Sequence, residues 1–172
     1  MTAFVALLRA VNVGGTGKLP MSELAAMCDA AGFAKVRTYI ASGNVVFESP
    51  RPEAKVKVEL EKRLADYAGK PVGVLVRTAA EMDKVLAANP FRDAPGNRAV
   101  VIFLDDAPPA DAAEKAVGRA EDEAVALGRR EIYVRYGAAG QGNSKLRVPA
   151  AKAGTARNLN TVAKLAQMAA EL

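Results

Sequence analysis

Residues 36–47, VRTYIASGNVVF, hold two short runs rich in β-branched and aromatic residues on either side of Ser42-Gly43. Such runs are typical of strands, and a Ser-Gly pair between them suits a tight turn. The sequence therefore predicts strands over 36–40 and 44–48 that form a hairpin. The hairpin decides the fold because it occupies the centre of a longer β-α-β-β-α-β pattern.

A strand and a helix are expected on each side of this hairpin. Before it, the apolar run 4–11 predicts a buried strand, and Pro20 is well placed to begin a helix. After it, residues 72–77 alternate like a strand. They follow a helix whose buried face is indicated by Val56, Leu60, Leu64 and Tyr67. The order over 3–77 predicts a ferredoxin-like plait, with two helices on one face of an antiparallel sheet.

Residues 78–98 are expected to form a connecting helix and loop. Thr78 and Glu81 make a capping-box pair that opens the helix, and a polar loop follows it. The predicted domains are thus the ferredoxin-like α+β domain over 1–77 and a second α+β unit over 99–172. This second unit is expected to be smaller, less regular and plait-type.

The second unit contains two apolar runs that predict strands, at 99–104 and 131–136. Between them, helical spacing is shown by Ala113, Ala116, Val117, Ala120, Ala124 and Leu127. A terminal helix is indicated by Val162, Leu165, Ala166 and Ala169.

The composition excludes several classes of site. The chain has 172 residues, 51% hydrophobic and 25% charged, which is ordinary for one or two soluble domains. It has no histidine and a single cysteine, Cys28, which excludes histidine bases, Ser-His-Asp triads and an internal disulfide. No apolar run has the length of a membrane span and none resembles a signal peptide, so a cytoplasmic protein without membrane contact is expected. No pattern selects a reaction, a cofactor, a metal or an oligomeric state.

The net charge of +5 is unevenly distributed along the chain. Residues 1–22 and 132–170 contain eight basic residues and no acidic one. This distribution predicts a single electropositive surface if folding brings the two segments together. The alternative is a solvated face with no partner.

The loop NVGGTGK, residues 12–18, connects the first strand to the first helix. Gly14 and Gly15 allow the backbone to turn its amides outward, and Lys18 supplies a full charge, which together favour a phosphate or carboxylate cradle. A Walker A loop is excluded, because Asn12 stands where that pattern needs glycine and Leu19 where it needs serine or threonine. A flexible connector is the alternative.

A second glycine-rich loop, residues 137–145, ends in Ser144 and Lys145. It is interpreted as a mobile lid that brings a hydroxyl and an ammonium group to the same anion, or else as a surface hairpin. Arg157 offers bidentate binding to an anion, and Asn158 or Asn160 is expected to cap the last helix.

Three segments resemble a bacterial family known as domain of unknown function 1697. They are LLRAVNVGGTGKLPMSEL at 7–24, VRTYIASGNVVF at 36–47 and SKLRVPAAKAGTARNLNTVAKLA at 144–166. The resemblance covers nearly the whole chain and implies two plait-type α+β units, but it brings no reaction. The family usually has tryptophan where this chain has Leu159. That change alters binding if the tryptophan stacks on a ligand, and is tolerated if it is a core residue.

These observations lead to the hypothesis of a small anionic ligand, such as a nucleotide, in a basic cleft between the two glycine-rich loops. Weak nucleic-acid binding without sequence preference is an alternative, because the charge suits a phosphate backbone although aromatics are few. A structural or oligomerisation module without ligand is another. The residues expected to bind are Arg9, Asn12, Gly14, Gly15, Lys18, Ser42, Asn44, Ser144, Lys145, Arg157, Asn158 and Thr161.

Overall fold

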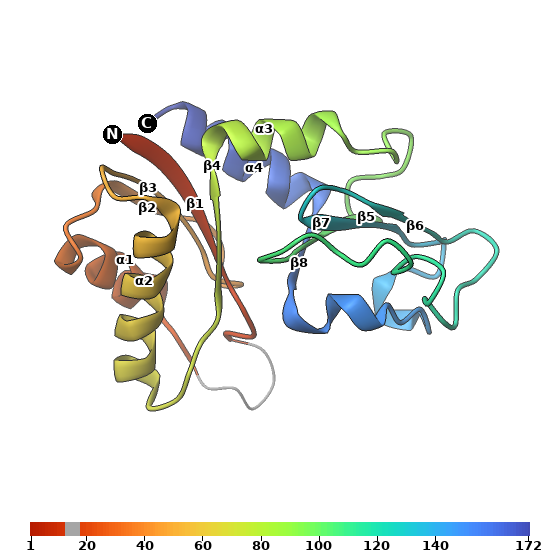
Figure 1. The fold of residues 1–172 in the computed structure, drawn as a ribbon, viewed down its shortest axis with the longest axis horizontal. Helices are drawn as coiled ribbons and strands as arrows, with labels where there is room; N and C mark the ends of the chain where they lie inside the picture. The colour runs from red at the N-terminus through yellow and green to blue at the C-terminus, as the bar shows by residue number, and fades with distance from the viewer. Residues whose placement is uncertain (13–17) are drawn as a thin grey trace. The chain divides into compact units, whose positions relative to one another are not determined.

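The computed structural model describes residues 1–12 and 18–172, and the chain divides into two compact units (Figure 1). The first unit comprises residues 1–83 and 164–172, and the second comprises residues 84–163. Each unit contains a four-stranded antiparallel sheet, so the predicted α+β class is confirmed. The predicted domain limits at 77 and 99 stay a prediction.

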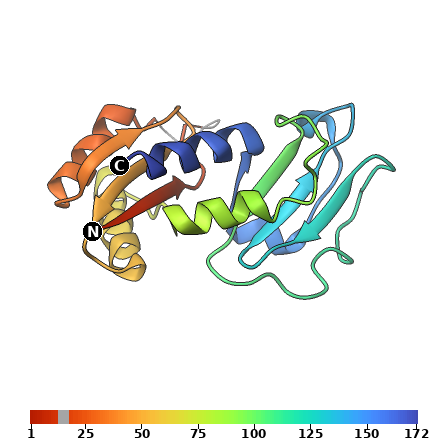
Figure 2. The same cartoon turned by 90° about the horizontal axis from the view of Figure 1, so that it is seen from above.

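The first unit is built on a sheet with the strand order β2-β3-β1-β4. Its elements in chain order are β1 (Thr2–Leu8), α1 (Met21–Ala30), β2 (Ala34–Thr38), β3 (Asn44–Ser49), α2 (Glu53–Ala68) and β4 (Val74–Thr78), followed by α3 (Ala79–Ala87). The predicted hairpin is confirmed, since β2 and β3 pair antiparallel around the turn at Gly43. Both ends of the chain lie at the same edge of this unit (Figures 1 and 2).

Both faces of this sheet are buried. On one face, Phe47 stacks on Phe33 with ring centroids 4.3 Å apart, within a core that α1 and α2 complete. On the other face, the apolar side chains with at most 1% exposure are Val5, Leu7, Val46 and Leu75. The expectation that Tyr67 is buried on α2 is wrong, because its side chain is 47% exposed. The buried residues of α2 are Val56, Leu60 and Leu64.

The capping box predicted at the start of α3 is confirmed. The backbone N–H of Glu81 donates to the Thr78 hydroxyl at 3.1 Å, and the N–H of Thr78 donates to the Glu81 carboxylate at 3.0 Å. These two bonds satisfy amides that the first helical turn leaves unpaired.

The second unit has the strand order β6-β7-β5-β8. Its elements are β5 (Ala99–Phe103), β6 (Ala124–Leu127), β7 (Glu131–Arg135), the 3-10 turns Gln141–Asn143 and Pro149–Ala153, β8 (Thr155–Asn158) and the start of α4 (Leu159–Ala170). The strands predicted at 99–104 and 131–136 and the terminal helix are confirmed. β8 has no counterpart in the sequence prediction, since its four residues carry no alternating pattern.

The helix predicted from alanine spacing at 113–127 is wrong. Gly118 has a positive φ of 74°, and residues 124–127 form β6, which pairs antiparallel with β7. Alanine spacing says little about which face is buried, because so small a side chain fits a helix, a turn or a strand. Pairing with β7 therefore outweighs the helix preference of alanine.

The two faces of the second sheet are covered in different ways. On one face, the Tyr133 hydroxyl donates to the Val85 carbonyl of α3 at 2.7 Å. On the other face, Val100, Ile102 and Val134 pack against Leu146 and half-buried residues of the irregular segment 144–154. Across the described ranges, no helix combines the length and the apolar character needed to span a bilayer.

Candidate anion-binding site

A cavity of about 690 Å³ lies in the first unit, where β1 ends. Among its lining residues, Arg9, Lys18 and Lys70 are cationic and none is acidic. The remaining lining residues are Ala10, Val11, Leu19, Leu64, Tyr67, Ala68, Pro71, Val72 and Gly73. The structure thus brings together two of the residues that the sequence singled out, Arg9 and Lys18, and adds Lys70.

Arg9 follows β1 and is held against the segment that leads into β4. Its backbone N–H donates to the carbonyl of Gly73 at 2.9 Å. A Cβ atom at Gly73 would lie 2.9 Å from Cδ of Arg9, closer than two carbon atoms approach without a shift. Glycine at this position therefore leaves room for the arginine side chain.

Hydrogen bonds from Asn12 fix the backbone next to Lys18. Its amide group donates to the carbonyls of Leu19 and Ala41, each at 2.8 Å, and its carbonyl accepts the N–H of Leu19 at 2.6 Å. Its φ is +56°, a left-handed conformation that asparagine tolerates better than most residues. Asn12 therefore fixes Leu19, the neighbour of Lys18, to the end of β1 and to the β2–β3 turn.

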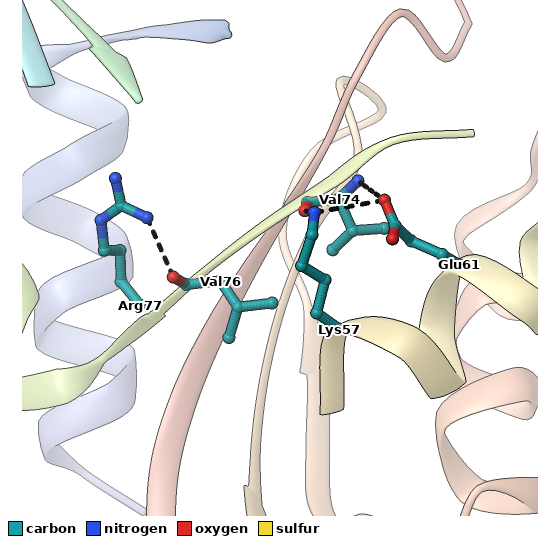
Figure 3. A network of polar contacts seen from close by, with 5 residues as sticks. All are labelled: Lys57, Glu61, Val74, Val76 and Arg77. Carbon is teal, nitrogen blue, oxygen red and sulfur yellow. Dashed lines mark hydrogen bonds and ion pairs between the residues drawn. The ribbon is translucent and has the colours of Figure 1, made fainter. Parts of the chain in front are cut away.

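A polar network holds α2 against the start of β4 (Figure 3). The carboxylate of Glu61 accepts the N–H of Val74 at 3.1 Å and pairs with Lys57 at 3.2 Å, while Lys57 donates to the carbonyl of Val74. Lys57 and Glu61 thus bind both backbone polar groups of Val74. The cavity wall is formed by residues 64–68 and 70–73, which lie on either side of the chain reversal between α2 and β4. These bonds therefore hold the two sides of the wall together.

Ser42 and Asn44 serve the hairpin turn. The buried amide of Asn44 donates to the Tyr39 carbonyl at 2.9 Å and to the Ser42 hydroxyl at 3.0 Å. Turn chemistry accounts for both residues, and neither lines the cavity. Gly14 and Gly15 lie outside the described residues.

Ser144, which was predicted to lie in the second glycine-rich loop, binds the carboxylate of Glu123. Its hydroxyl donates to Glu123 at 2.7 Å, and that carboxylate also accepts the N–H of Ala120 at 3.0 Å. Lys145 is exposed, and its backbone carbonyl would lie 2.2 Å from a Cβ atom at Gly118. Both residues belong to the second unit, so their meeting with Arg9 and Lys18 stays a prediction.

Acidification is expected to release the contacts that Glu123 makes. The Ala120 N–H, followed by the Ser144 hydroxyl, holds the pKa of the Glu123 carboxyl below its ordinary value. Because this pKa is lowered in the folded state, the stabilisation is present above the unfolded value of about 4.3 and is lost as the pH falls below it. Urea unfolding at pH 6 and pH 3 should show Glu123→Gln less stable than the parent only at pH 6. An equal deficit at both pH values would contradict this, and exposed Glu121→Gln is the control.

Arg157, Asn158 and Thr161 lie where β8 meets α4. Arg157 is 7% exposed and donates to the Thr155 hydroxyl at 2.7 Å and to the Ala156 carbonyl at 2.9 Å. Burial lowers the pKa of its guanidinium to about 10, so it is charged at neutral pH. Asn158 accepts the N–H of Thr161 at 2.9 Å, which confirms the predicted cap of α4. Leu159 is half-buried, and the effect of tryptophan there stays open.

Sequence reasoning missed Lys70 and Tyr67 as cavity residues. Tyr67 was assigned to the helix core because it continues the spacing of Leu60 and Leu64. Lys70 directly follows Gly69, which ends α2 in a left-handed conformation. That helix end was a usable signal for a cation, since the last carbonyls of a helix attract positive charge. Among the described residues, no group of three or more acidic, cysteine or histidine side chains could hold a metal.

The comparisons identify relatives but no activity. A family model described as "Protein of unknown function (DUF1697)" matches residues 1–133. The conserved bacterial protein SP0830 from Streptococcus pneumoniae has a similar solved structure, with a TM-score of 0.78, 24% sequence identity and 98% of each chain covered. At this identity the likeness shows the fold alone. No curated protein matches the chain. The chain belongs to the DUF1697 family of proteins of unknown function.

Proposed function

We propose that the protein binds a small ligand bearing a phosphate or carboxylate group, such as a nucleotide, in the cavity at the end of β1. The observation that carries this proposal is the lining of that cavity, with Arg9, Lys18 and Lys70 and no acidic residue. Its volume of about 690 Å³ falls within the range of roughly 300–1,000 Å³ typical of small-molecule sites.

The lining suits a ligand with two parts, an anionic group and an apolar body. The guanidinium of Arg9 suits two oxygens of one anionic group, and the lysines add point charges. Leu64, Val72 and the ring of Tyr67 offer an apolar wall for the body of the ligand. The anion must be held by side chains, because the C-terminal end of α2 carries a partial negative charge.

Two finer expectations from the sequence belong to this proposal. We take the first unit to be a ferredoxin-like plait, which its β-α-β-β-α-β order and antiparallel sheet support. We also assign the protein to the cytoplasm. Cys28 is a buried free thiol whose pKa burial raises to about 12, so it is not a reactive group.

Calorimetric titration with pyrophosphate, AMP and ATP tests the site. Arg9→Ala and Lys18→Ala should each weaken binding about tenfold or more, because a hydrogen bond to a charged group contributes roughly 1.5–3 kcal/mol. Lys55→Ala, an exposed lysine of α2 outside the lining, is the matched control and should bind like the parent. Equal losses in the control, or no binding of any of these anions by the parent, would rule out the proposal.

Gly73→Ala should displace the side chain of Arg9 and leave the fold intact. The new methyl group would crowd Cδ of Arg9, a flexible part of the chain, so the arginine can turn away at little cost in stability. We expect pyrophosphate affinity to fall about three- to tenfold, while the melting temperature changes by only a few degrees. An unchanged affinity would mean that Arg9 does not contact the ligand.

The dependence of binding on salt separates this function from nucleic-acid binding. Affinity for single-stranded nucleic acid should fall steeply with salt, with a slope set by the number of phosphates neutralised. Stacking of bases on the first sheet is not favoured, because Phe4 and Phe47 are buried in its core. Light scattering tests the third alternative, a ligand-free oligomerisation module.

A further inference from the structure

The two sheets have four edge strands, and side chains bond the open backbone groups of two of them. β2 and β4 border the first sheet, and β6 and β8 border the second. On β4, Lys57 and Glu61 bond Val74, and the carbonyl of Val76 accepts a bond from Arg77 at 3.0 Å (Figure 3). On β8, the guanidinium of Arg157 donates to the carbonyl of the preceding residue at 2.9 Å.

The third edge strand, β2, is protected by charge and by an irregular register. Lys35 and Arg37 lie along it with exposed side chains. Its pairing with β3 also shifts between Ala34 and Arg37. Charged side chains and bulges both hinder an open edge from pairing with another strand. Three of the four edges are thus protected.

The fourth edge strand, β6, has the sequence AVAL and a regular register with β7. The Gly128 N–H donates to the Glu131 carbonyl at 2.8 Å. Because bonded pairs alternate along an antiparallel ladder, the backbone groups of Val125 and Leu127 face away from β7. Within the described ranges, no side chain bonds these outward groups. β6 therefore offers an open, uncharged edge to another strand.

The residues around β6 are charged in a pattern that suits pairing with a second copy. Residues 121–123, Glu-Asp-Glu, precede the strand, and Arg129 and Arg130 follow it. In an antiparallel pair of β6 strands, the acidic end of each copy meets the basic end of the other, whereas a parallel pair would bring like charges together. These charges select the orientation, and the backbone supplies the bonds. The bond from Arg130 to the Asp105 carbonyl is compatible with that role.

We propose that β6 pairs antiparallel with β6 of a second copy of this chain, which joins the two four-stranded sheets into one. The two-fold axis passes beside Ala126, so that Val125 of each copy faces Leu127 of the other and exchanges backbone bonds with it. Val125 and Leu127 are half-buried beside the apolar cluster of the second unit, and their partners in the other copy cover more of them. Because so short a strand buries little area, the dimer is weak and dissociates in the micromolar range.

Sedimentation velocity of the full chain, from low-micromolar to near-millimolar concentration, tests the proposal. The parent should change from monomer to dimer over this range. Val125→Pro removes one outward N–H from each copy and no bond to β7, so it should weaken the dimer about tenfold or more. A thermal melt checks that the variant folds.

Opposite charges at the two-fold axis provide a second test. Ala126→Lys and Ala126→Glu should each weaken the dimer about tenfold, because like charges then face each other, whereas an equimolar mixture of the two should form a heterodimer. Ala156→Lys adds the same charge on the protected edge β8 and is the matched control, which should dimerise like the parent.

Amide hydrogen exchange locates the contact. The N–H groups of Val125 and Leu127 should exchange more slowly as the protein concentration rises, whereas that of Ala156 should not change.

Several outcomes would overturn the proposal. A parent that stays monomeric to near-millimolar concentration is one. Another is a dimer that Val125→Pro and both Ala126 variants leave intact, since it would use a different surface. A third is a mixture of folded Ala126 variants that stays monomeric, because β6 would then not face itself. An equal loss in Ala156→Lys is a fourth.

The dimer is independent of the proposed function, because β6 shares no residue with the cavity at Arg9. Ala126→Lys should therefore bind pyrophosphate like the parent. Failure of pyrophosphate to bind the parent would disprove the proposed function and leave the dimer standing.

Discussion

Gly43→Ala is expected to lower the free energy of unfolding by about 3–5 kcal/mol, because a left-handed backbone and an overpacked contact both penalise the new methyl group. Gly43 has a φ of +92° in the β2–β3 turn. A Cβ atom there would lie 2.6 Å from Cγ2 of Val11 and 2.9 Å from Cβ of Leu8. Neither atom can move far, because Leu8 and Val11 are buried and the Leu8 N–H bonds to the Gly43 carbonyl at 2.9 Å.

Gly32→Ala is the matched control for this substitution. Gly32 also has a left-handed backbone, with a φ of +85°, but no atom lies within 4 Å of where its Cβ would be. The control should therefore cost only the backbone term, about 1–2 kcal/mol. Urea unfolding of both variants measures the difference. Equal costs would mean that the turn relaxes and that the close approach to Val11 carries no penalty.

Asn12→Asp is expected to destabilise the protein by about 2–3 kcal/mol and to weaken pyrophosphate binding. The aspartate has the same shape and tolerates the left-handed φ, so backbone strain does not change. Its carboxylate still accepts the N–H of Leu19, but it cannot donate to the carbonyls of Leu19 and Ala41. Two donated bonds are replaced by two repulsive contacts, and the segment that presents Lys18 is released.

Asn143→Asp provides the control for the loss of donated bonds. The Asn143 amide donates a single bond, to the carbonyl of Ala139 at 3.1 Å, on an exposed loop. Its replacement should cost less than about 1 kcal/mol and leave pyrophosphate binding unchanged. If Asn12→Asp costs no more than this control, Asn12 does not fix the segment that presents Lys18 to the cavity.

The first unit was predictable because its signals are local. The hairpin has a turn residue with positive φ at Gly43, α2 ends at a left-handed Gly69, and α3 begins with a reciprocal side-chain cap at Thr78 and Glu81. Each signal is contained in a few neighbouring residues, and the expected strands and helices follow one another in the order observed. The second unit was less predictable because alanine spacing at 113–127 fits several structures equally well.

The candidate binding residues also differ in whether a local sequence signal identifies them. Arg9 and Lys18 could be selected from the sequence, since a charged residue at the end of a buried strand and a lysine after a glycine-rich loop are visible locally. The role of Asn12 could not, because the Ala41 carbonyl that it reaches lies in the β2–β3 turn, whose approach depends on packing. The burial of Arg157 could not either, because it depends on the pairing of β8 with β5.

The amino-acid sequence by itself determined the order of elements in the first unit, the strand pairing of its hairpin and the ends of its helices. The tertiary structure alone decided that Lys70 and Tyr67 join Arg9 at a cavity, and that a loop covers one face of the second sheet. The physical reason is the separation along the chain over which each effect acts. Backbone preferences and helical spacing act between neighbours, whereas a cavity is the volume left over when distant segments pack.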